Sequence, residues 1–136
     1  MKTSIPGVLT SEEAENLTSQ ISKFGNTDFT PIRKVLDAIK AAGIDFTLHH
    51  KSYWRVESKA AGHGWHVDTG NKNHMAWCTY GGSVLLTDPK DFTGGELTYK
   101  DGVAPKEKLR LHIHSSDVEH MVTPHEGKRI VLLLFI

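Results

Sequence analysis

The sequence predicts a mainly β domain with helices at its N-terminal end, built as a sandwich or barrel rather than from βαβ units. Three observations lead to this fold class. Two segments before Gly43 have the spacing of amphipathic helices, and after Gly43 the apolar period changes to two. From there on, short segments typical of strands alternate with frequent turn signals.

The first predicted helix begins with the capping box Thr10-Ser11-Glu12-Glu13, in which a threonine and a glutamate satisfy each other's backbone N–H groups. Apolar residues at helical spacing continue through Leu17, Ile21 and Phe24. Gly25 is expected to end this helix, because glycine commonly follows the last helical turn.

The second predicted helix begins at Thr30-Pro31, since a proline in the first turn loses no hydrogen bond, and Gly43 closes it. We expect both helices to pack as a layer against a sheet. The second helix has one apolar stripe, formed by Ile32, Val35, Leu36, Ile39 and Ala42.

Alternating apolar and polar residues predict a long strand over residues 46–56. Residues 58–64 form a loop that leads to His66, and residues 69–74 form a polar loop. Residues 75–80 are predicted as a short strand interrupted by Gly81-Gly82, and residues 88–91 as a turn. Further strands are predicted over residues 83–87, 96–99, 109–114, 118–123 and 129–135.

Length and composition narrow the class of protein. The 136 residues suffice for one domain, and the 16 basic residues balance the 16 acidic ones, which disfavours a nucleic-acid or membrane surface held by bulk charge. No apolar run follows Met1, no stretch approaches a membrane span, and Cys78 is the only cysteine. These features predict a soluble protein of the cytoplasm, whose metal site would use imidazole and carboxylate ligands.

Such ligands are found in His66 and Asp68, which form an H-x-D pair. Residues two apart on a strand point to the same face, so both side chains can reach one metal ion. With His120 they would form a 2-His-1-carboxylate triad, the arrangement that holds Fe(II) with open positions. The structural alternative for Asp68 is to cap the turn through Thr69-Gly70.

The third ligand has competitors among the other histidines. His112 and His114 share one face of a predicted strand and could form a metal pair of their own, and His125 precedes a turn glycine. We favour His120, because a Val-x-Pro sequence and a downstream arginine follow it. His125 itself is assigned to polar surface or a strand face, as are His49, His50, His63 and His74.

Arg129 begins the last predicted strand. Arg129, Val131, Leu133 and Phe135 share one face of it, and the even-numbered residues 130–136 share the other. A charge in so apolar a strand should be paired, and a guanidinium matches a carboxylate with two parallel hydrogen bonds. The partner is either a ligand carboxylate or an ordinary salt bridge. Lys128 would take this place if the register shifted by one.

Together these features resemble the 2-oxoglutarate and Fe(II)-dependent dioxygenases, in particular their prolyl-4-hydroxylase-like branch. The shared pattern is the H-x-D pair, the Gly-Gly-Glu-Leu sequence at 94–97, His120, a proline four residues later and a basic residue nine later. The resemblance extends over residues 53–136. It implies a double-stranded β-helix, or jelly roll, buttressed by the two helices, in a single domain with a helical part over about 10–43 and a core over about 44–136.

The resemblance also implies an activity. Such an enzyme uses Fe(II), 2-oxoglutarate and O₂, with ascorbate as a further possible requirement, to hydroxylate a C–H bond with release of succinate and CO₂. Arg129 would hold the C5 carboxylate of 2-oxoglutarate. A peptidyl proline is the leading substrate, in a peptide or protein gripped by residues 58–64, residues 69–80 or a partner chain, because the sequence ends one strand after His120 without a C-terminal helix.

Other functions remain open at this point. One is a non-catalytic jelly-roll domain in which the same residues bind Zn²⁺ or Ni²⁺ or a ligand. Another is a structural or interaction module in which the triad is only polar surface. A dioxygenase could also act on a free amino acid, a small metabolite or a nucleobase, although the neutral charge disfavours the last of these.

The sequence departs from the relatives in two places. Where they often carry a tyrosine, about ten residues before the first histidine, this chain has Val56-Glu57, and the nearest tyrosine is Tyr53. Tyr53 either helps to bind the co-substrate or packs on the sheet. Residues 84–86 are apolar where relatives often have a polar or aromatic partner. Trp65 either lines the substrate pocket or packs near the metal, and Gly94-Gly95 is expected to form a tight turn with positive φ.

Overall fold

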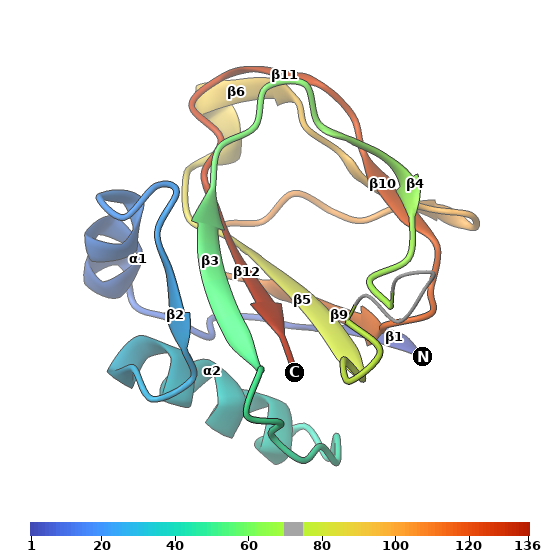
Figure 1. Ribbon diagram of the computed structural model, residues 1–136. Helices are drawn as coiled ribbons and strands as arrows, with labels where there is room; N and C mark the ends of the chain where they lie inside the picture. The colour runs from blue at the N-terminus through green and yellow to red at the C-terminus, as the bar shows by residue number, and fades with distance from the viewer. Residues whose placement is uncertain (70–74) are drawn as a thin grey trace.

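The computed structural model describes residues 1–69 and 75–136, and Figure 1 shows antiparallel sheets with two helices beside the larger one. Its six strands are arranged in the order β1-β9-β5-β12-β3-β2. A second sheet has the order β4-β10-β7-β8, and β11 pairs with β6. All these pairs are antiparallel, and the described chain forms the predicted jelly roll with two buttressing helices.

The strands are short. Those of the larger sheet are β1 (Lys2–Ile5), β9 (Leu111–Ser115), β5 (Tyr80–Leu85), β12 (Val131–Phe135), β3 (Tyr53–Glu57) and β2 (Phe24–Asn26). Those of the four-stranded sheet are β4 (His63–His66), β10 (His120–Val122), β7 (Leu97–Tyr99) and β8 (Gly102–Val103). The remaining pair is β11 (His125–Gly127) with β6 (Phe92–Gly94).

The helices begin where the sequence predicts. Helix α1 (Ser11–Thr18) has the complete capping box, with Thr10 as N-cap and Glu13 at N3. Helix α2 (Thr30–Ala41) follows the N-cap Phe29, and Gly43 adopts a φ of +82° after its end. A 3₁₀ turn, η2 (Pro89–Asp91), stands where a turn was predicted. The buried residues of α2 are Ile32, Val35, Leu36 and Ile39, whereas the predicted stripe member Ala42 is exposed.

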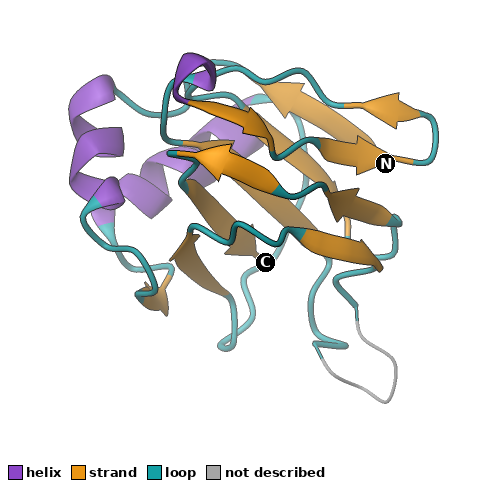
Figure 2. Ribbon diagram, turned by 90° about the horizontal axis from the view of Figure 1, so that it is seen from above, coloured by secondary structure: helices purple, strands orange, loops and turns teal. Residues whose placement is uncertain are grey.

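Strand β12 separates the core from the functional cavity, because its side chains alternate between two faces. The even-numbered residues 130–136 are buried in the apolar core together with both helices, which cover this face of the larger sheet (Figure 2). Val131, Leu133 and Phe135 instead line a cavity on the opposite face. The predicted division of this strand is therefore confirmed.

The predicted extent of the first helix is wrong. The helix stops at Thr18, and the Thr18 and Ser19 hydroxyls donate hydrogen bonds to carbonyls of the preceding turn. The chain then reverses and forms β2 beside β3. Ile21 and Phe24 are 44% and 75% exposed, so their helical spacing does not reflect burial.

Two strand predictions are also wrong. Of the predicted strand over residues 46–56, only its end belongs to β3, because the Ser52 N–H donates to the His49 carbonyl in a turn. Residues 75–79 form turn and loop, and β5 runs straight through Gly81-Gly82. The predicted strands do not include β1, β2, β4, β6, β8 and β11. Residues 70–74 of the predicted polar loop, including His74, lie outside the described residues.

None of the helices in the described part of the chain combines the length and the apolar character needed to cross a membrane.

Candidate metal centre and co-substrate cavity

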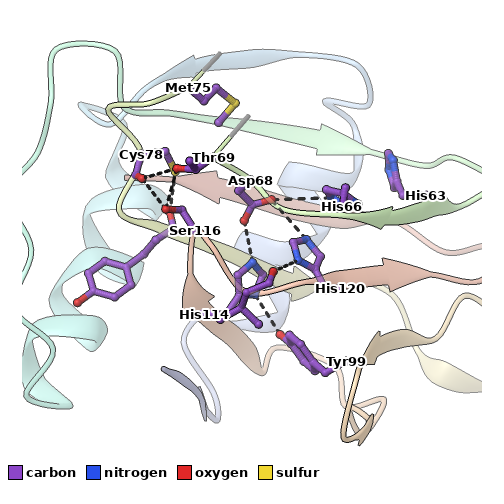
Figure 3. Close-up of polar contacts among 12 residues, drawn as sticks. His63, His66, Asp68, Thr69, Met75, Cys78, Tyr99, His114, Ser116 and His120 are labelled. Carbon is purple, nitrogen blue, oxygen red and sulfur yellow. Dashed lines mark hydrogen bonds and ion pairs between the residues drawn. The ribbon is translucent and has the colours of Figure 1, made fainter. Parts of the chain in front are cut away.

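His66, Asp68 and His120 come together at the β4 edge of the four-stranded sheet (Figure 3). His66 is the last residue of β4 and is paired with His120 on β10. Asp68 follows two residues after His66. One ligand atom from each residue lies within 4.8 Å of the others. Oδ1 of Asp68 is 3.3 Å from Nε2 of His120 and 3.8 Å from Nε2 of His66.

Backbone carbonyls orient both imidazoles. Nδ1 of His66 donates to the Gly64 carbonyl at 2.7 Å, and Nδ1 of His120 donates to the Val118 carbonyl at 2.9 Å. Because a carbonyl can only accept, each Nδ1 carries a proton and each neutral ring has its lone pair on Nε2. The two Nε2 atoms and Oδ1 of Asp68 therefore form a cluster of three donor atoms suited to a divalent metal.

The Asp68 carboxylate is ionised. Burial acts to raise its pKa, but hydrogen bonds from His114 and His120 hold the pKa well below its usual range. Burial lowers the pKa of His66. Burial also acts to lower the pKa of His120, but Asp68 outweighs it and the pKa is raised, because the carboxylate favours the doubly protonated ring whose Nε2 donates to Oδ1. A metal bound at Nε2 would replace that proton.

His114 is the residue at this site whose role the sequence did not identify. The sequence indicates it only as a competing third ligand, yet its Nε2 lies 2.7 Å from Oδ2 of Asp68. Its ring centre is 4.2 Å from that of His120, and it lines the same cavity as the triad. The Tyr99 hydroxyl lies 3.0 Å from Nδ1 of His114, and burial raises the pKa of Tyr99 to about 12. Among the predicted competitors, His112 contacts the Pro105 carbonyl at 3.1 Å.

Two histidines assigned to polar surface or strand faces prove less exposed. His125 is buried in β11, with its ring 6.3 Å from that of Phe92. His63 is partly buried and contacts Glu57 across the cavity wall, with Nε2 2.8 Å from Oε2.

Arg129 lies two residues before the start of β12, in the wall of the cavity that the triad also lines. It is 7% exposed, and its Nε has no hydrogen-bond partner. Burial lowers the pKa of the guanidinium, and none of the carboxylates in the described residues forms an ion pair with it. Lys128 is exposed, so the register places the arginine at the cavity. A buried guanidinium without a partner, beside three metal-binding groups, fits a ligand that carries a carboxylate.

The turn before β7 makes room for Arg129. Gly94 and Gly95 have φ values of +70° and +62°, which confirms the predicted turn conformation. A Cβ on Gly95 would overlap Cδ of Arg129 and lie 2.7 Å from its Nε. The Gly-Gly sequence therefore admits the long side chain as well as forming the turn.

Tyr53 packs on the sheet. Its ring stacks on Phe135 with the ring centres 5.0 Å apart, and its hydroxyl lies 4.0 Å from Sδ of Met75. Phe135 lines the cavity, whereas Tyr53 lines a neighbouring groove. Trp65 is 44% exposed and lies beneath Nζ of Lys100, which is 3.9 Å from the centre of its ring.

The cavity has polar groups that sequence reasoning missed. Arg55 and Glu57 line it from β3, with Nη2 of Arg55 3.5 Å from Oε1 of Glu57. Ser83 lines it from β5. The alternation along each strand was the available signal, because Tyr53, Arg55 and Glu57 occupy one face of β3, but it did not reveal which face meets the cavity.

Comparisons with known proteins agree with this geometry. None of the known protein-family models matches the sequence, and no curated protein matches it significantly. Among solved structures, a Pseudomonas putida prolyl-4-hydroxylase superimposes with a TM-score of 0.72 at 16% identity, covering 99% of this chain and 83% of that one.

Two further structures are similar. The viral collagen prolyl hydroxylase of Paramecium Bursaria Chlorella virus-1, in its 2-oxoglutarate complex, has a TM-score of 0.71 at 13% identity, covering 98% of this chain and 94% of that one. A Burkholderia pseudomallei oxidoreductase of the 2-oxoglutarate-Fe(II) oxygenase family has a TM-score of 0.63 at 12% identity, covering 98% and 82%. The chain therefore has the jelly-roll fold of 2-oxoglutarate-Fe(II) oxygenases, in the form found in prolyl-4-hydroxylases.

Proposed function

We propose that this protein is an Fe(II)- and 2-oxoglutarate-dependent dioxygenase that hydroxylates a C–H bond. The observation that carries this proposal is the position of Arg129, a buried guanidinium that forms no ion pair within the described residues and lies in the same cavity as His66, Asp68 and His120. A metal triad alone fits many metals and activities. The added cationic group fits a co-substrate that carries a carboxylate at each end.

The chain's own residues have separate roles in this proposal. His66, Asp68 and His120 would hold Fe(II), and the ionised carboxylate cancels one of its two charges. Bound Fe(II) would supply the activation of O₂, coupled to conversion of 2-oxoglutarate into succinate and CO₂ and to hydroxylation of the substrate. Arg129 would bind the C5 carboxylate through parallel hydrogen bonds.

The apolar side chains beside Arg129 have a supporting role. Val131, Leu133 and Phe135 line the cavity from β12 and exclude water around the co-substrate chain. Tyr53 stacks on Phe135, so we propose that it shapes this wall. No protein side chain is required as a general base.

For the substrate, we propose a peptidyl proline in a peptide or protein. The structural likeness to two prolyl hydroxylases supports this choice. Residues 58–64 lead to His66 on the cavity wall, and we propose that they contact the peptide. A requirement for ascorbate and a cytoplasmic location remain predictions.

The first test is an anaerobic titration of the Fe(II)-loaded protein with 2-oxoglutarate, monitored by the weak visible charge-transfer band of the complex. We expect the band in the wild type and its loss in His120→Ala. In Arg129→Ala, half-saturation should need about 100-fold more 2-oxoglutarate, since two charge-assisted hydrogen bonds contribute roughly 3 kcal/mol. Arg110→Ala serves as the control, because this arginine pairs with Glu107 outside the cavity.

Each alternative gives a different result. If metal binds without a charge-transfer band, the protein is a metal- or ligand-binding jelly roll of another kind. If no metal binds, the three residues are only a polar cluster, in which Asp68 and His120 are buried. If the band appears, a panel of proline-containing peptides, free amino acids and nucleotides, followed by mass spectrometry for a gain of one oxygen atom, tests the substrate.

A further inference from the structure

Three buried side chains form a chain of hydrogen bonds that ends on Asp68 of the candidate triad (Figure 3). The Tyr99 hydroxyl is 3.0 Å from Nδ1 of His114, and Nε2 of His114 is 2.7 Å from Oδ2 of Asp68. The exposed fractions of Tyr99, His114 and Asp68 are 7%, 4% and 9%. They come from β7, β9 and the segment after β4, so only the folded chain brings them together.

The two ends of this chain determine the protonation of the ring between them. Ionised Asp68 can only accept a hydrogen bond, so Nε2 of His114 must carry a proton and donate it. In neutral His114, Nδ1 then has the lone pair, which accepts the hydrogen bond from the Tyr99 hydroxyl. A single tautomer satisfies all three groups.

The contact also distinguishes the two oxygens of Asp68. Oδ2 faces His114, whereas Oδ1 faces Nε2 of both triad histidines. The backbone of β5 confines the carboxylate further, because a Cβ on Gly81 would overlap Oδ2. Rotation of the carboxylate would give up the hydrogen bond from His114, and the buried ring would lose its charged acceptor.

We propose that His114, oriented by Tyr99, is a positioning residue that occupies Oδ2 of Asp68 and leaves Oδ1 as the oxygen offered to the metal. This inference rests on the proposed function of the triad. A carboxylate that binds through one oxygen uses one coordination position, whereas a bidentate carboxylate uses two. His114 thereby preserves an open position for 2-oxoglutarate or O₂ through its hold on Asp68.

The inference is tested with Co(II) as the probe. The visible spectrum of Co(II) reports its coordination, and its binding can be measured without the exclusion of O₂. The variants are His114→Phe, which removes the donor, and Tyr99→Phe, which removes one hydroxyl at nearly constant volume. His112→Phe is the matched control, since it is the same substitution on the same strand at a ring that contacts Pro105 instead. Thermal unfolding of each metal-free variant establishes that it is folded.

We expect His114→Phe to bind Co(II) about 10- to 100-fold more weakly, as is usual when the partner of a ligand is removed. Its spectrum should change in band position and intensity, and Tyr99→Phe should weaken binding less. His112→Phe should match the wild type. In the metal-free protein, imidazole ¹⁵N NMR should show His114 protonated at Nε2, and a mixture of tautomers in Tyr99→Phe.

Several results would overturn the inference. If His114→Phe and Tyr99→Phe bind Co(II) with the affinity and spectrum of the wild type, His114 does not position Asp68. If His114→Phe loses binding as completely as His120→Ala, His114 is itself a ligand. If the wild type binds no metal, the proposed function has failed and this inference with it, and the wild-type measurement alone separates that case. Should His114→Phe not fold, Tyr99→Phe and the NMR measurement decide.

Discussion

Oδ2 of Asp68 lies in the space that a side chain on Gly81 would occupy. Gly81 is on β5, paired with His114 on β9, and a Cβ there would also lie 3.0 Å from Nε2 of His114. The absence of a side chain at this position lets the carboxylate and the imidazole meet against the backbone of the larger sheet. Gly81 is thus part of the candidate metal centre although it offers no ligand.

Replacing Gly81 by alanine should displace Asp68 from the triad, because the added methyl group overlaps its carboxylate. We expect Gly81→Ala to weaken Co(II) binding at least about tenfold. Overpacking should lower the free energy of unfolding by about 1–3 kcal/mol. Isothermal titration calorimetry and urea denaturation measure the two effects.

Gly64→Ala is the control for this substitution, since a Cβ on Gly64 meets nothing within 4 Å although the residue lies in β4 between His63 and His66. It should retain wild-type affinity for Co(II). Wild-type affinity in Gly81→Ala would mean that Asp68 has another position from which to bind the metal.

The same glycine shows what the sequence could and could not predict. Two consecutive glycines disfavour a strand, and they were therefore interpreted as an interruption. Their place inside β5 depends on Asp68 and His114, which lie 13 residues before and 33 residues after Gly81 in the chain. No local pattern records that requirement.

Local rules succeeded where local interactions determine the structure. The capping box at Thr10 and the two faces of β12 were predicted correctly, because the first depends on neighbouring residues and the second on strand periodicity. The predicted helix was wrong around Phe24, because helical spacing alone does not specify burial. The H-x-D pair indicated where a metal site could form, but His114 became visible only through the pairing of β9 with β5.

The capping box should contribute measurably to stability. The Glu13 N–H donates to Oγ1 of Thr10 at 3.1 Å, and the Thr10 N–H donates to Oε1 of Glu13 at 2.8 Å. We expect Thr10→Ala to lower the free energy of unfolding by about 1 kcal/mol. Urea denaturation should show a lower midpoint with an unchanged slope. Thr47→Ala, at an exposed loop position, should have no comparable effect, and equal losses in both variants would contradict the role of the cap.

Cys78 should be protected from ionisation at alkaline pH. Burial, aided by the negative charge of Asp68, raises the pKa of its thiol from 9.0 to about 12. The folded state holds this proton more tightly than the unfolded state. The resulting stabilisation is complete below pH 9.0 and is lost as the pH rises towards about 12.

Alkylation by iodoacetamide at pH 9 tests this prediction, with mass spectrometry as the readout. The folded protein should react at least about a hundredfold more slowly than the urea-unfolded chain, because the thiolate is the reactive form. In Cys78→Ala, the free energy of unfolding should decline less steeply between pH 9 and pH 11. Equal alkylation rates in the folded and unfolded protein would show that the thiol is neither buried nor raised in pKa.

Gly95→Ala should separate co-substrate binding from metal binding. The added Cβ would overlap Cδ of Arg129, whereas the metal triad comes from other strands. We expect the affinity of the Fe(II)-loaded protein for 2-oxoglutarate to fall at least about tenfold, because charge-assisted hydrogen bonds from Arg129 contribute to that affinity. The affinity for Co(II) should remain unchanged.

The control must reproduce the backbone strain of alanine at positive φ without the contact to Arg129. Gly43 meets this requirement, because its φ is +82° and a Cβ there meets nothing within 4 Å. Both variants should lose about 1 kcal/mol of stability, but only Gly95→Ala should lose affinity for 2-oxoglutarate. Equal affinity in the two variants would mean that the position of Arg129 does not matter for the co-substrate. A loss of Co(II) binding in Gly95→Ala would instead show that the two halves of the cavity are coupled through the turn.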